Sequence, residues 1–130
     1  MTPEQIALVR QSFAKLQPAL PEVGREFYVR LFYEHPELRE LFHGDMERQS
    51  RALMAMMQLV VNLLDLQDKL VPVIHYLGER HATLGVKPEY YPPFCAALVD
   101  SLEAVLRDDF TPDTRRAWET ACAFMIDNMT

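Results

Sequence analysis

Apolar residues recur at intervals of three and four along most of the chain, with polar residues between them. This spacing is typical of amphipathic helices, whereas a half-buried strand would alternate at every second residue. The β-branched residues also fall within the helical periods, so no strand is predicted. Proline, glycine and threonine interrupt the pattern at several points and mark helix ends. We therefore expect an all-α fold of about six to seven helices.

The signals at these interruptions are specific enough to place the helix ends. Thr2 and Gln5 form a capping box with Pro3 between them. Thr111 is expected to cap a last helix, and Gly85 suits the left-handed residue just past a helix end. The predicted helices begin with one that opens at Pro3 and keeps an apolar face to Leu16. The others cover about residues 21–35, 46–64, 66–84, 91–107 and 112 to the end, with a short turn over 36–42.

One histidine stands in a helix with an apolar face. Leu77, His81 and Leu84 share that face because they are three and four residues apart. His75 lies six residues before His81 and therefore points to a different side. A neutral imidazole among apolar side chains is a good iron ligand. An ordinary core or surface histidine explains the same pattern, so this segment alone leaves both interpretations open.

Composition and charge narrow the classes of function. The 130 residues, 49% of them apolar, fit one globular domain over residues 1–130. The net charge of -6 argues against nucleic acid and against anionic membrane surfaces. The longest apolar region, Leu53–Leu66, is interrupted by Gln58, Asn62 and Asp65 and is too short to cross a bilayer. No signal-peptide pattern is visible, so a cytoplasmic location is expected.

Several familiar motifs are absent. The chain has no glycine-rich phosphate loop, no closely spaced cysteines for a zinc ribbon and no His-Glu-x-x-His helix. The four histidines do not repeat on one helix face, so no zinc or di-iron site is expected. Cys95 and Cys122 suit a reducing compartment, and each is expected to pack as a small buried residue.

Four stretches in order give the chain its resemblance to a known family. They are Glu26–Phe32, His35–Phe42, Gln49–Leu53 and Leu77–Tyr91. With these segments the sequence resembles a bacterial single-domain globin, similar to the haem domain of flavohaemoglobins, over nearly its whole length. The resemblance implies a globin fold packed around one haem b.

The resemblance also implies a role for seven side chains. His81 would bind iron on the proximal side, with its other ring nitrogen donating to a backbone carbonyl or a neighbouring group. Tyr28 and Gln49 would donate hydrogen bonds to a gas bound on the distal side. Whether Tyr28 also binds ferric iron directly stays open. The other cofactor-binding residues implied are Phe42, Leu53, Leu77 and Tyr91.

The sequence departs from the flavohaemoglobin pattern in three respects. The family's proximal carboxylate, carried on its last helix, would lie beyond Thr130, which also leaves open that the chain is truncated. Cys122 stands where the family has a tyrosine. The reductase domains are absent from these residues, so a catalytic cycle would need an external reductase.

Three functions remain in view. The first is reversible binding of O₂, for storage, delivery or sensing, with NO and CO as further ligands. The alternative is an NO dioxygenase that draws electrons from an external reductase. A haem-free signalling module with a globin fold is the third, and retention of His81, Phe42 and the distal pair argues against it.

Overall fold

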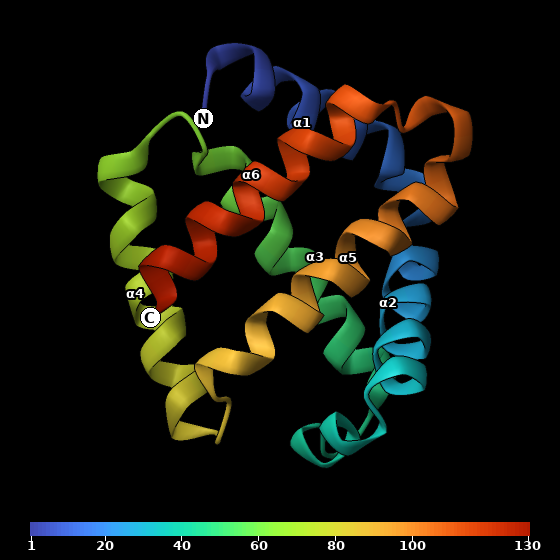
Figure 1. Ribbon diagram of the computed structural model, residues 1–130, viewed down its shortest axis with the longest axis vertical. Helices are drawn as coiled ribbons and strands as arrows, with labels where there is room; N and C mark the ends of the chain where they lie inside the picture. The colour runs from blue at the N-terminus through green and yellow to red at the C-terminus, as the bar shows by residue number, and fades with distance from the viewer.

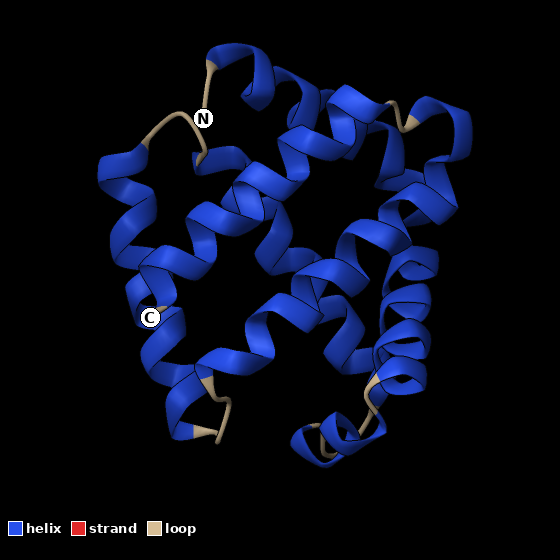
Figure 2. Ribbon diagram, viewed as in Figure 1, coloured by secondary structure: helices blue, strands red, loops and turns tan.

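The computed structural model describes all 130 residues, and every regular element in it is a helix (Figure 2). The expectation of an all-α fold without strands is confirmed. The α-helices are α1 (Pro3–Leu16), α2 (Leu20–Glu34), α3 (Met46–Leu63), α4 (Gln67–Thr83), α5 (Tyr91–Leu106) and α6 (Pro112–Met129). Four short 3₁₀ helices join them: η1 (Gln17–Ala19), η2 (Pro36–Leu41), η3 (Pro88–Tyr90) and η4 (Arg107–Asp109).

The capping signals set the helix ends where the sequence placed them. The Thr2 hydroxyl accepts a hydrogen bond from the Gln5 backbone N–H at 3.1 Å, and the Gln5 side chain accepts one from the Thr2 N–H at 3.0 Å. Gly85 has a φ of 90°, in the left-handed region that glycine favours. Observed and predicted ends agree within one or two residues. Arg107 is an exception. It is predicted to be helical, but its φ of 54° is positive and α5 ends at the residue before it.

The helices are stacked in crossing layers. Figure 1 shows α5 and α6 running across the front, with α3 behind them and α4 and α2 on opposite sides. α2 packs chiefly against α5, while α6 packs against α1 and α4. Segments far apart in the sequence therefore meet in the centre of the molecule, where α3, α4, α5 and α6 surround a common space.

Two glycines let neighbouring helices approach closely. A Cβ atom on Gly24 of α2 would lie 1.6 Å from the Ser50 hydroxyl of α3. A Cβ atom on Gly78 of α4 would lie 2.3 Å from the Met129 carbonyl oxygen at the end of α6. A larger side chain at either position would push the helices apart, so glycine permits the close approach of α2 to α3 and of α4 to α6.

Buried side chains form two apolar clusters. The larger joins all six α-helices, and Phe13 and Trp118 lie within it with ring centroids 6.3 Å apart. The smaller gathers residues of α2, η2 and α5 around Phe27, Tyr28 and Leu31. Both clusters border the central space, so the core also forms the walls of a cavity.

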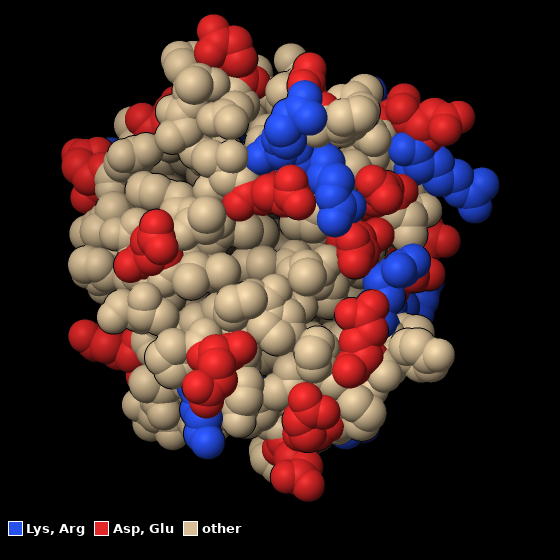
Figure 3. Space-filling model, in the orientation of Figure 1, with Lys and Arg blue, Asp and Glu red and all other residues tan.

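Charged side chains remain on the outside. Figure 3 shows acidic groups scattered over one face, with lysine and arginine gathered mainly toward one side and a wide uncharged band across the middle. None of the helices combines the length and the apolar character that crossing a membrane requires.

Candidate functional site

An apolar cavity of about 410 Å³ lies between the helices. Of its 27 lining residues, 25 are hydrophobic. The two exceptions are Gln49 and His81. The structure brings together all seven side chains that the sequence singled out, since each of them lines this one cavity: Tyr28, Phe42, Gln49, Leu53, Leu77, His81 and Tyr91.

His81 enters the cavity from the last turn of α4. Its Nδ1 atom is buried and has no hydrogen-bond partner. The sequence led us to expect a carbonyl or another neighbouring group on the second ring nitrogen, and that expectation is wrong for Nδ1. Burial holds the pKa of His81 below its usual range, so the ring is neutral at pH 7. A neutral imidazole that faces an apolar cavity is a suitable ligand for a metal.

Tyr91, one of the cofactor-binding residues implied by the resemblance, lies beside this histidine. The ring centroids of His81 and Tyr91 are 6.0 Å apart and the rings are tilted by 46°. No hydrogen bond joins the two side chains, and burial raises the pKa of Tyr91. Tyr91 therefore contributes an aromatic wall next to His81 and leaves its Nδ1 unpaired.

Tyr28 reaches the cavity from α2. Its side chain is only 8% exposed and packs edge-on against Phe42, with ring centroids 5.3 Å apart. The Tyr28 hydroxyl makes no hydrogen bond within the protein. Desolvation raises the pKa of Tyr28 to about 12. The group is therefore a neutral phenol with a free O–H donor at the cavity wall.

Gln49 and Leu53 lie one turn apart on α3, and both line the cavity. The Gln49 amide also donates a hydrogen bond to the His43 carbonyl at 3.4 Å, in the turn before α3. A bond of that length is weak, so the amide is only loosely held. Gln49 is therefore a second polar group at the cavity wall.

Aromatic rings close the cavity around Tyr28. Phe42 packs against Phe94 of α5 with centroids 6.2 Å apart, and Phe94 packs against Tyr91 at 6.4 Å. Such edge-to-face pairs bury much apolar area and keep water out.

The sequence did not identify the wall that α6 provides, because nothing local marks where a distant helix will pack. Its cavity-lining residues are Trp118, Ala121, Cys122, Met125, Ile126 and Met129.

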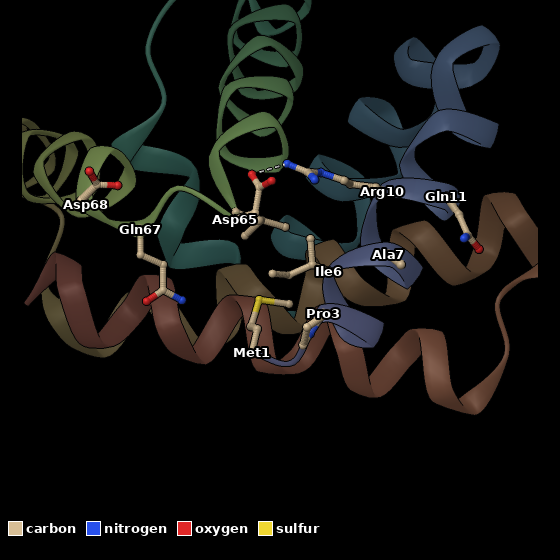
Figure 4. A pocket seen from close by; sticks show the side chains of 10 residues that line it. Met1, Pro3, Ile6, Ala7, Arg10, Gln11, Asp65, Gln67 and Asp68 are labelled. Carbon is tan, nitrogen blue, oxygen red and sulfur yellow. Dashed lines mark hydrogen bonds and ion pairs between the residues drawn. The ribbon is translucent and has the colours of Figure 1, made fainter.

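A second hollow of about 870 Å³ lies between α1 and the connection from α3 to α4 (Figure 4). Three charged residues line it, Arg10, Asp65 and Asp68. Arg10 and Asp65 pair with each other at 2.7 Å, and the hydrogen bond from Arg10 lowers the pKa of Asp65. No histidine or cysteine lines this hollow. Its chemistry is therefore that of a polar surface depression.

The cavity contains too few protein ligands to hold a bare metal ion. No group of three or more histidine, cysteine, aspartate or glutamate side chains is placed to bind one. A metal bound at His81 would need its other ligands from a cofactor.

Comparison with known proteins agrees with this arrangement. The family model described as Globin matches residues 25–129. The flavohemoprotein of Bacillus subtilis (strain 168) is 30% identical over 125 residues, which are 94% of this chain and 31% of that protein. The flavohemoprotein of Deinococcus radiodurans is 30% identical over 132 residues, covering 99% of this chain and 33% of the relative. The chain thus spans about a third of the length of the curated relatives it matches.

A solved structure shows the same fold. The crystal structure of a hexacoordinated heme protein from an anhydrobiotic tardigrade superposes with a TM-score of 0.90 and 21% sequence identity. The match covers 99% of this chain and 92% of the other. From the family model, the relatives and the shared fold, the chain belongs to the globin family, as its four stretches led us to expect.

Proposed function

We propose that the chain is a single globin domain that binds one haem b and, through it, O₂ reversibly. The observation behind this proposal is the neutral, unpaired imidazole of His81, which shares an apolar cavity with the free hydroxyl of Tyr28. A cytoplasmic role in storage, delivery or sensing of O₂ fits this arrangement.

The cavity suits a porphyrin better than it suits a bare metal. A porphyrin supplies four nitrogen ligands in a plane, so a single histidine completes the proximal side. The lining is almost entirely apolar, as an apolar macrocycle requires. No Cys-x-x-Cys-His sequence is present for covalent attachment, which favours haem b.

The distal residues would then govern ligand binding. Haem held by His81 would supply an iron atom that can bind O₂, NO or CO. Tyr28 would donate its O–H to such a ligand, and Gln49 would add a second donor after its bond to the His43 carbonyl is broken. Phe42 and Leu53 exclude water from the same space.

Replacing Tyr28 tests the distal role. Tyr28→Phe keeps the ring and removes the donor. We expect O₂ to dissociate roughly ten- to a hundredfold faster, because a hydrogen bond to a charged group contributes about 1.5–3 kcal/mol. Stopped-flow displacement of O₂ by CO measures the rate. Tyr33→Phe is the matched control, since Tyr33 of the same helix is 86% exposed. An unchanged rate in Tyr28→Phe would exclude the donor role.

NO dioxygenation is the second candidate, favoured by the similarity to flavohemoproteins and by the same two donors. The reaction combines NO, O₂ and one electron to give nitrate. This chain would need that electron from an external reductase. Steady-state loss of NO with a flavin reductase and NADH separates the two functions. Sustained turnover supports the dioxygenase, whereas a single turnover without recycling supports reversible binding.

A haem-free signalling role is disfavoured by the cavity. An unpaired histidine nitrogen in an apolar space costs free energy. In a module without a cofactor, nothing would offset that cost. Protein that stays free of haem after expression with ample haem would restore this third function.

A further inference from the structure

The two cysteines of the chain meet at the wall of the cavity. Cys95 lies on α5 and Cys122 on α6, and the two helices pack against each other. Both residues line the same cavity, and neither forms a disulfide. Cys95 packs against the buried cluster that contains Cys122, and the side-chain interaction between the two thiols shifts the pKa of each. The sequence predicted two separate buried residues, and the fold makes them a pair.

The two thiols differ in environment. Cys95 is half-buried, whereas Cys122 is only 7% exposed. The contact with Cys122 lowers the pKa of Cys95. The same contact, together with burial, raises the pKa of Cys122 well above its usual range. Cys95 is therefore the thiol that forms a thiolate more readily and that a reagent reaches first.

We propose that Cys95 and Cys122 are a redox-active dithiol that a small-molecule disulfide converts into an intramolecular disulfide between α5 and α6. This property is separate from the proposed gas binding, because it uses neither His81 nor the distal donors.

The exchange needs no cofactor. The Cys95 thiolate attacks one sulfur of the reagent, the reagent's S–S bond breaks, and one thiolate leaves. The Cys122 sulfur, losing its proton, then attacks the Cys95 sulfur and expels the second thiolate. Both thiolates take up protons, so the protein loses two hydrogens and the reagent becomes two thiols. The protein is oxidised and the reagent is reduced.

The link would act on the cavity itself. α5 also carries Phe94 at the cavity wall, and α6 carries Met125 and Met129 there. Joining the two helices restricts their separation in the oxidised form. We expect a higher thermal midpoint after oxidation, and its return to the starting value after a thiol reductant is added.

The test treats the protein as purified, with its haem, with 2-hydroxyethyl disulfide under nitrogen. We expect both thiols to disappear from a titration in denaturant, the mass to fall by two hydrogens, and peptides from α5 and α6 to be cross-linked. Two thiols that remain titratable would overturn the proposal. Separate mixed disulfides on Cys95 and Cys122 would also overturn it.

Two variants check the order of attack. Cys122→Ser should stop at a mixed disulfide on Cys95, because no second thiol remains to resolve it. Cys95→Ser should leave Cys122 unmodified while the protein is folded. Modification of Cys122 at the wild-type rate in Cys95→Ser would contradict the assigned order. Circular dichroism confirms that each variant is folded, and the wild-type result alone decides whether the pair forms.

Discussion

Two regions of the molecule differ in whether their polar side chains have hydrogen-bond partners within the protein. In the packed region, around Phe13, Ser12 and Trp118, the Trp118 indole N–H donates to the Ser12 hydroxyl at 2.8 Å, and that hydroxyl donates to the Leu8 carbonyl at 2.8 Å. In the cavity region, around His81 and Tyr28, the His81 Nδ1 atom is buried without a partner, and the Tyr28 hydroxyl at the cavity wall forms no hydrogen bond within the protein. The polar groups of the first region pair with one another, whereas those of the second face the cavity without protein partners.

The contrast separates stability from function. A buried polar group with a partner stabilises the fold, whereas an unpaired one costs free energy. Substitutions in the packed region should therefore change the free energy of unfolding and leave ligand binding nearly intact. Substitutions in the cavity region should change ligand binding and leave the free energy of unfolding nearly intact.

The largest effect on stability is expected at Phe13. This ring is almost completely buried against Trp118. Phe13→Ala should lower the free energy of unfolding by about 3–5 kcal/mol, because it removes apolar contacts and leaves a hole. Urea unfolding measures the change. Tyr33→Ala, on an exposed aromatic ring, should stay within about 0.5 kcal/mol of wild type. Equal losses of unfolding free energy in the two variants would contradict the structural role given to the packed region.

A smaller effect is expected at Ser12. Ser12→Ala leaves the Trp118 N–H buried without an acceptor and should cost about 1–3 kcal/mol of unfolding free energy. Trp118 is the only tryptophan, so its fluorescence reports both the local change and the unfolding transition. Ser101→Ala is the matched control, since the buried Ser101 hydroxyl bonds only to the Ala97 carbonyl of its own helix. The control should lose less than Ser12→Ala, and the opposite order would contradict the role of the tryptophan bond.

The smallest effect is expected from the hydroxyl of Tyr28. Because that group has no protein partner, Tyr28→Phe should change the unfolding free energy at pH 7 by less than about 0.5 kcal/mol. At high pH the wild type should weaken. Tyr28 ionises near 10.0 when unfolded and near 12 when folded. Between these values the unfolded state holds fewer protons, so stability falls as pH rises.

Urea titrations at a series of alkaline pH values measure this decline. The unfolding free energy of Tyr28→Phe should decline less at alkaline pH than that of wild type, whereas Tyr33→Phe should decline as wild type does. An identical alkaline decline in wild type and Tyr28→Phe would show that the Tyr28 phenol is not held neutral by burial.

Much of the fold was predictable because local chemistry sets helix ends. The Thr2 capping box, the Thr111 cap and the stop at Gly85 act within a few residues of themselves, so their effect is visible in the sequence. The common wall shared by Tyr28 and His81 followed only from resemblance to globins, since the two residues lie on different helices.

Other features depend on contacts that no local pattern encodes. The close approach of Gly24 to Ser50 and the meeting of Cys95 with Cys122 arise from how helices cross. The unpaired Nδ1 of His81 was mispredicted for the same reason, because the position of a second-ring partner depends on the packing of the whole cavity.

The most direct test of the account is the absorption spectrum of purified wild type, His81→Ala and His75→Ala, each in ferric, reduced and CO-bound forms. His75 is exposed on the same helix and serves as the control. We expect a haem Soret band in wild type and His75→Ala, with loss of haem or of histidine ligation in His81→Ala alone. The same haem content and the same spectra in all three proteins would contradict this expectation.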